Sequence, residues 1–168
     1  MATFVIDAPS DRLDKSGLSV SFRASCEFRS DLAAVLSTIR ATFARPLYAV
    51  GISNGATAVA NLATLNDAAV AMYVLLSPAH IASPGSELIT SVSFTKPVLV
   101  VGNRRDECRY SPPATFSTLA SKVGGAAAEV VWIDGGMAPI GGPCGPFGFH
   151  SFFGAEALAV KSIAEKLK

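Results

Sequence analysis

A serine lies at the centre of the pentapeptide Gly51-Ile52-Ser53-Asn54-Gly55. The G-x-S-x-G spacing is typical of a nucleophile elbow, a sharp strand-to-helix turn that holds a serine hydroxyl above the end of a sheet. We expect side chains at positions 51 and 55 to clash in such a turn, and the amides of the following helix to stabilise an oxyanion. The pattern makes Ser53 the candidate nucleophile, against the alternative of a glycine-rich turn with a structural role.

A serine hydroxyl is a poor nucleophile unless a base removes its proton and a carboxylate orients that base. His150 follows the last apolar run of the chain, and Asp106 follows the run before it. We therefore predict a catalytic triad of Ser53, Asp106 as acid and His150 as base. The alternatives are a capping or arginine-paired Asp106 and a His150 packed among phenylalanines. We interpret His80 as a loop residue, with lining of a substrate pocket as the alternative.

Short apolar runs must supply the elements that position these residues. They occupy residues 3–6, 47–52, 70–76, 97–101 and 130–133. Such nearly continuous runs are typical of strands buried on both faces. Because segments with helical spacing separate them, the sequence predicts an α/β fold with a mostly parallel sheet of about five strands and helices on both faces. Functional residues should then lie just beyond the carboxyl ends of the strands.

Four segments have apolar residues at helical spacing, and they cover residues 32–43, 56–63, 112–123 and 155–167. Ser30 or Asp31 is the expected cap of the first, and Gly124 ends the third. We expect residues 10–27 to form a polar loop. The Gly- and Pro-rich residues 135–148 should form a long loop at the site.

Composition narrows the function classes. The chain has 168 residues, of which 50% are apolar, which suits a single domain over residues 1–168. Fourteen basic residues nearly balance 13 acidic ones without a basic run, so we expect no nucleic-acid partner. No apolar stretch is long enough to span a bilayer, and residues 1–6 lack the basic start of a signal peptide. We expect no membrane partner, no cofactor and, without a Cys/His cluster, no metal.

The cysteines carry a second signal. Cys108 lies close to the proposed acid and Cys144 close to the proposed base, so a bridge between them would tie the two catalytic loops together. Such a bridge would indicate an oxidising compartment, secreted or periplasmic. The alternative is a pair of buried, reduced thiols in a cytoplasmic protein. Cys26 is left unpaired.

The segments around Ser53, 97–106 and 148–150 resemble the α/β-hydrolase superfamily. Within it, residues 7–12, 22–25 and 150–156 are similar to a group of small bacterial hydrolases. The resemblance implies hydrolysis, with Ser53 as nucleophile, Asp106 as acid, His150 as base and the amide of Asn54 as one oxyanion donor. A basic residue is usual where this chain has Asn54.

The superfamily has three further strands before the one that residues 3–7 resemble, and the loop after the last of them gives the second oxyanion amide. We hypothesise that strand 3–7 pairs directly with strand 47–52 and brings residues 8–11 to the site. Pro9 has no amide hydrogen, so Ala8 or Ser10 would donate. Asp11 is then a candidate substrate contact, or else a turn residue. Alternatively, a second copy of the chain covers an open sheet edge.

These patterns predict a serine hydrolase that acts on small carboxylic esters through an acyl-enzyme. The short chain between Ser53 and Asp106 leaves no room for a large lid. Three alternatives remain: a binding or scaffold protein that lost its oxyanion hole, an acyltransferase with the same triad, and a fragment that another chain completes.

Overall fold

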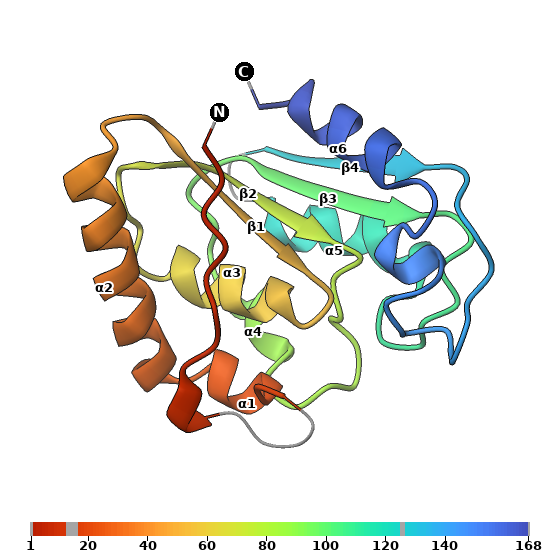
Figure 1. Cartoon of the computed structure of the whole chain (residues 1–168), viewed down its shortest axis with the longest axis horizontal. Helices are drawn as coiled ribbons and strands as arrows, with labels where there is room; N and C mark the ends of the chain where they lie inside the picture. Colours follow the sequence, from red (N-terminus) through yellow and green to blue (C-terminus); the bar gives the residue numbers. More distant parts are fainter. Residues whose placement is uncertain (1, 13–16, 125–126, 168) are drawn as a thin grey trace.

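The computed structural model describes residues 2–12, 17–124 and 127–167. In this part of the chain, four parallel strands form one sheet in the order β1-β2-β3-β4 (Figure 1). They are β1 (Leu47–Ile52), β2 (Val70–Leu76), β3 (Val98–Asn103) and β4 (Ala128–Ile133). The predicted parallel α/β sheet is confirmed, with four strands rather than about five.

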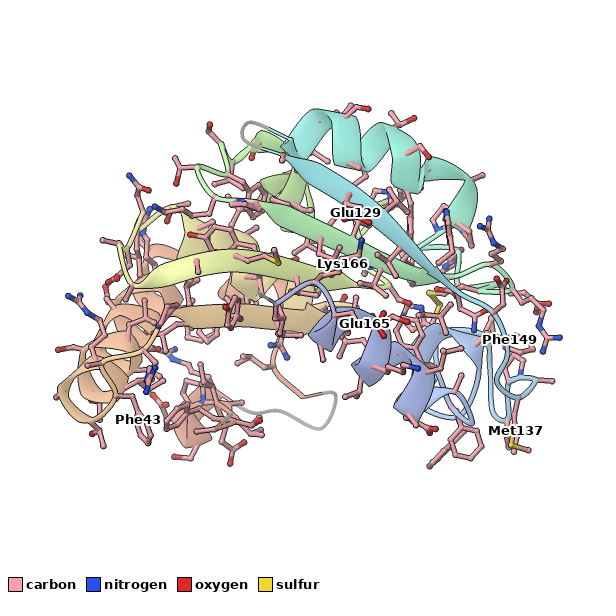
Figure 2. The ribbon with its side chains drawn as sticks, turned by 90° about the horizontal axis from the view of Figure 1, so that it is seen from above. Phe43, Glu129, Met137, Phe149, Glu165 and Lys166 are labelled. Atoms are coloured by element: carbon pink, nitrogen blue, oxygen red, sulfur yellow. A yellow bond between two sulfur atoms is a disulfide. The ribbon has the colours of Figure 1, made fainter. Side chains whose placement is uncertain are left out.

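Helices cover both faces of the sheet, as Figures 1 and 2 show. Their bounds are α1 (Val20–Arg23), α2 (Cys26–Thr42), α3 (Gly55–Ala63), α4 (Glu87–Ser91), α5 (Phe116–Val123) and α6 (Glu156–Ala164), with single 3₁₀ turns η1 (Ser10–Arg12), η2 (Pro113–Thr115) and η3 (Phe149–Ser151). Leu75 and Val100 face the larger core with α2 to α5, whereas Val74 and Leu99 face α6. This alternation explains why the strands have nearly continuous apolar sequences. Among the described helices, none is long and apolar enough to cross a membrane.

The amino-terminal segment corrects one prediction. Residues 3–6 form no strand, and Val5 is 91% exposed. Phe4 packs instead against Phe43, with 4.8 Å between the ring centroids. Strand β1 is an edge of the sheet, and its Val50 and Ile52 are exposed. The hypothesis that residues 3–7 pair with the nucleophile strand is therefore wrong: an apolar run becomes a strand only where a neighbour satisfies its backbone groups.

The region predicted as a loop over residues 10–27 also contains structure. It holds η1, α1 and the start of α2, which begins at Cys26 rather than near Leu32. Ser25 caps α2, because its Oγ accepts a hydrogen bond of 3.1 Å from the amide of Phe28. Ser30 and Asp31, the predicted caps, lie inside the helix. The predicted loop over residues 135–148 has neither helix nor strand.

The two glycines of the pentapeptide differ in the space around them. A Cβ at Gly51 would lie 2.3 Å from the carbonyl oxygen of Gly55 and 2.8 Å from Cγ2 of Val59. A Cβ at Gly55 would meet nothing within 4 Å. The expected clash is confirmed at position 51 and wrong at position 55, because Gly55 begins α3 with open space where its Cβ would lie.

We expect Gly51→Ala to lower the free energy of unfolding by about 2 to 3 kcal/mol, since strand β1 must move away from α3. Gly55→Ala should change it by less than about 1 kcal/mol, because alanine favours a helix over glycine. Urea denaturation of both variants tests this. Equal losses at the two positions would contradict the steric explanation.

Candidate active site

Ser53 occupies the turn between β1 and α3, and its φ of 52° lies in the left-handed region. A non-glycine residue rarely adopts this conformation, and such strain concentrates at functional sites. The turn is held to the neighbouring strand and its loop. The Ser53 amide donates to the carbonyl of Leu76 at 2.8 Å, and the amide of Ala79 donates to the Ser53 carbonyl at 3.3 Å. The serine is therefore fixed at the carboxyl edge of the sheet.

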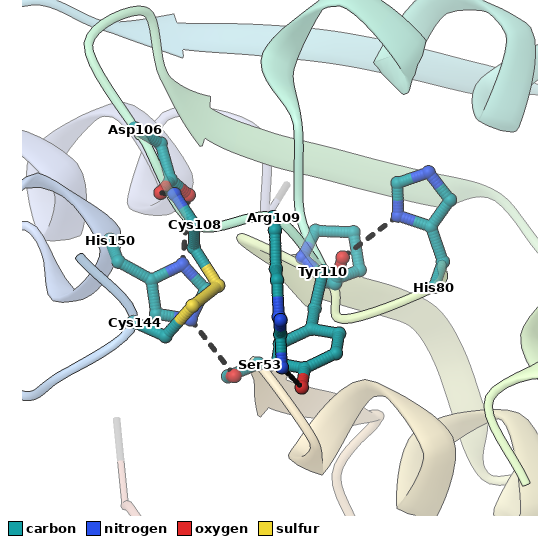
Figure 3. The surroundings of a disulfide bond; sticks show 9 residues. Ser53, His80, Asp106, Cys108, Arg109, Tyr110, Cys144 and His150 are labelled. Carbon is teal, nitrogen blue, oxygen red and sulfur yellow. Dashed lines mark hydrogen bonds and ion pairs between the residues drawn. A yellow bond between two sulfur atoms is a disulfide. The ribbon is translucent and has the colours of Figure 1, made fainter. Parts of the chain in front are cut away.

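The structure brings Ser53, His150 and Asp106 into one hydrogen-bonded chain (Figure 3). His150 Nε2 lies 2.9 Å from Ser53 Oγ, and His150 Nδ1 lies 2.8 Å from Asp106 Oδ2. His150 is 3% exposed and Asp106 is 6% exposed. Because an ionised carboxylate only accepts, Nδ1 carries the hydrogen and the Nε2 lone pair faces the serine hydroxyl. This tautomer can remove the Ser53 proton.

The Asp106 carboxylate has a second hydrogen-bond partner. Its Oδ1 accepts from the amide of Cys108 at 2.8 Å. Cys108 forms a disulfide with Cys144, which confirms the predicted bridge over a separation of 36 residues. The bridge ties the loop after β3 to the loop that leads to His150. Cys26 is free and exposed.

The three predicted oxyanion donors, Asn54, Ala8 and Ser10, differ in their positions and in their hydrogen bonds. Asn54 is the residue before the first turn of α3, so its amide is part of the helix N-terminus beside Ser53. The amide of Ala8 donates to the Asp7 carboxylate at 2.8 Å, and Ser10 begins η1. The Asp11 carboxylate lies 3.6 Å from Nε of Arg12.

Ala8, Ser10 and Asp11 make no hydrogen bond or ion pair with the three residues of the hydrogen-bonded chain within the described residues. Because residues 3–7 do not join the sheet, nothing in the strand register carries this segment to the site. Among the described side chains, no group of three or more His, Cys, Asp and Glu residues could hold a metal ion.

Both nitrogens of the His80 ring have hydrogen-bond partners within the fold. Its Nδ1 donates to the carbonyl of Pro78 at 2.8 Å, and its Nε2 lies 2.9 Å from Thr115 Oγ1. The ring also packs edge-to-face on Phe116, with centroids 5.9 Å apart. His80 thus links the loop after β2 to the start of α5, which favours the interpretation as a loop residue over a substrate contact.

Burial lowers the pKa of His80 below its ordinary value of 6.5; Lys122 adds to the lowering, and the bond to Pro78 opposes it. The stability gained from neutral His80 should be complete above pH 6.5 and decline as the pH falls toward the lowered pKa of the folded state. The reason is that the unfolded chain binds the proton first. The variant His80→Gln has no imidazole at this position. The variant should be less stable than the wild type, and this difference in unfolding free energy should become smaller as the pH is lowered. Urea denaturation at several pH values measures the difference. A constant or growing deficit would contradict the lowered pKa.

Two residues near the site, Asn103 and Arg105, have no role in the sequence prediction. Asn103 ends β3 and is completely buried, and Arg105 lies in the turn before Asp106. In the sequence, Asn103 is marked only as a single polar residue at the end of an apolar run. The same pattern is found at the end of an ordinary strand, so it does not indicate a functional residue.

No family model matches the chain, and no curated protein matches it. Solved structures do match. Est1E from Butyrivibrio proteoclasticus has a TM-score of 0.58 and 17% identity, over 82% of this chain and 68% of that chain. Its form with ferulic acid bound has a TM-score of 0.57 and 18% identity, over 83% and 68% of the two chains.

Two further solved structures give similar values. A YdeN-like hydrolase from Pectobacterium atrosepticum has a TM-score of 0.55 and 18% identity, over 82% of this chain and 68% of that chain. Est816, an N-acyl homoserine lactone degrading enzyme, has a TM-score of 0.53 and 13% identity, over 82% and 74%. At these identities the likeness shows the fold, which is α/β-hydrolase-like.

Proposed function

We propose that this chain is a serine hydrolase that cleaves small carboxylic esters through an acyl-enzyme. The observation that carries the proposal is the hydrogen-bonded chain from Ser53 Oγ through His150 to Asp106, at the carboxyl edge of a parallel sheet. Acyl transfer requires a nucleophile bonded to a base and a carboxylate that orients the base, and the three residues make contacts in this order.

The first half of the reaction forms the acyl-enzyme. His150 Nε2 takes the proton of Ser53 as Oγ attacks the ester carbonyl, and Asp106 stabilises the resulting imidazolium. The amide of Asn54, at the positive end of α3, stabilises the oxyanion. His150 then gives its proton to the leaving alkoxide, the carbon–oxygen bond breaks, and the acyl group remains on Ser53.

The second half returns the enzyme to its starting state. His150 removes a proton from water, the hydroxide attacks the acyl carbonyl, and the proton passes to Ser53 Oγ as the carboxylic acid leaves. Between Ser53 and Asp106 the chain forms only α3, β2, α4, β3 and their connections. With no lid domain there, the site suits small or exposed esters.

The names of the neighbours agree with acyl chemistry. Est1E binds ferulic acid, which is a carboxylic acid, and Est816 degrades lactones, which are cyclic esters. Both properties belong to those proteins, and they support an ester as the substrate class to test first here.

One observation favours a second candidate, a scaffold or binding protein without turnover. The amide of Ala8, a predicted second oxyanion donor, is already bonded to the Asp7 carboxylate. Loss of one oxyanion donor costs about 10²- to 10³-fold in kcat, so a site with a single donor would be a slow catalyst.

Labelling with a fluorophosphonate probe, read by intact mass, separates the two candidates. A hydrolase should be labelled in the wild type and in the matched control Ser121→Ala, which removes an exposed hydroxyl on α5. Ser53→Ala should take up no label. Absence of labelling in folded wild-type protein would refute the hydrolase and favour the scaffold.

A further inference from the structure

Asn103 holds together the two loops that supply Asp106 and His150. Its Oδ1 accepts from the amide of Arg105 at 2.9 Å, and its Nδ2 donates to the carbonyl of Gly135 at 2.9 Å. Its backbone carbonyl also accepts from the amide of Asp106 at 3.1 Å. The two side-chain contacts admit only one orientation of the amide, because an N–H needs the oxygen and a carbonyl needs the NH₂ group.

Arg105 makes a second connection between the same loops. Its Nη2 donates to the carbonyl of Gly136 at 3.3 Å, and its Cζ lies 4.0 Å from the centre of the Phe149 ring. Phe149 is the residue before His150, and its Cδ1 would lie 3.6 Å from a Cβ added at Gly136. The start of the long loop and the residue next to the base are thus both held by the turn that carries the acid.

The long loop needs such contacts, because residues 135–148 contain no helix or strand that would fix their course. Asp106 and His150 are 44 residues apart in sequence, so their 2.8 Å contact depends on how the two loops dock. Asn103 is 0% exposed, and its hydrogen bonds therefore form away from competing water.

We propose that Asn103, assisted by Arg105, is a positioning residue that sets the contact between Asp106 and His150. The proposal rests on the proposed serine hydrolase function for its effect on rate. The effect on structure is the position of the turn that carries Asp106 relative to the loop that carries His150. This position can be measured without turnover. The proposal does not involve contact of Asn103 with substrate.

The first test compares Asn103→Ala with Asn61→Ala on p-nitrophenyl acetate. Asn61 is the matched control, a buried amide near the C-terminal end of α3, the opposite end of the helix from Ser53; its Nδ2 donates to the carbonyls of Arg23 and Ser25 at 2.9 and 2.8 Å. Asn103→Ala should lower kcat by about 10- to 100-fold with KM within about twofold, because a small misplacement of catalytic groups has effects of this size. Asn61→Ala should lower stability and leave kcat unchanged.

A second readout needs no substrate. The hydrogen on His150 Nδ1, bonded to Asp106, should give a proton NMR signal downfield of the amide region. Asn103→Ala should broaden or shift this signal, and Asn61→Ala should not. If wild type shows the signal but no turnover, the proposed function fails, and the response of the signal still decides the positioning role.

Arg105→Ala keeps the test decisive if Asn103→Ala does not fold, since Arg105 is exposed. Its control is Arg104→Ala, whose exposed guanidinium lies 4.8 Å from the Trp132 ring and 3.5 Å from Asp134. We expect kcat to fall about three- to tenfold in Arg105→Ala only. Folded Asn103→Ala with wild-type kcat and NMR signal would overturn the proposal. So would equal kcat and signal in the two arginine variants.

Discussion

Asp106→Asn should lower kcat on p-nitrophenyl acetate by about 10⁴-fold while the protein stays folded. The substitution keeps the size of the side chain and changes only which of its atoms can accept. In the wild type Oδ1 accepts from the amide of Cys108 and Oδ2 accepts from His150 Nδ1. An asparagine has one oxygen for these two donors.

The Cys108 amide decides which way the new side chain points. A backbone N–H must face the asparagine oxygen, so the NH₂ group faces His150 and donates to Nδ1. The imidazole hydrogen then moves to Nε2, where it faces Ser53 Oγ. In that tautomer His150 cannot accept the serine proton, so the nucleophile is present but not activated.

Steady-state kinetics and thermal melting of the same samples check this prediction. The control is Asp134→Asn, which removes an exposed carboxylate that pairs with Arg104. It should leave kcat unchanged. Activity of Asp106→Asn within tenfold of the wild type would show that the carboxylate does not select the tautomer of His150.

Removal of the disulfide should be the most destabilising of the proposed changes. For a bridge over 36 residues, loop-closure entropy predicts a loss of about 3 to 4 kcal/mol in the free energy of unfolding. In a chain of this size that lowers the melting temperature by about 10 °C. Cys108→Ala together with Cys144→Ala tests this by urea denaturation.

The free thiol provides the matched control. Cys26→Ala changes an exposed cysteine and should leave the unfolding midpoint close to that of the wild type. A dithiol reductant should bring the wild type down to the midpoint of the double variant and leave the double variant unchanged. The opposite outcome is a wild type that keeps its unfolding midpoint after thiol assays show that the disulfide is fully reduced. That result would contradict a stabilising bridge.

Local patterns explain what could be predicted from the sequence. Strands β1 to β4 follow from apolar runs of the right length, and the turn at Ser53 follows from a pentapeptide with one glycine that has no room for a side chain. The candidate residues Asp106 and His150 follow from their places after strands. Each of these inferences depends on a few consecutive residues.

Contacts between distant residues explain what could not be predicted. Residues 3–6 have the composition of a strand, but composition does not say whether a neighbouring strand is present, and Val5 is exposed. The side chain of Asn103 donates a hydrogen bond to the carbonyl of Gly135, which lies 32 residues away in a loop. The partner lies in a segment without periodicity, so no local pattern marks the pair.

The strand order of the sheet has a consequence for synthesis on the ribosome. Each strand pairs with the strand that precedes it in the chain, so the sheet can grow one strand at a time as the polypeptide emerges. Ser53 and His150 are 97 residues apart, and the base arrives only after β4. A nascent chain can therefore hold a completed serine turn without its base, and the proposed hydrolase would become active only once residue 150 has left the ribosome.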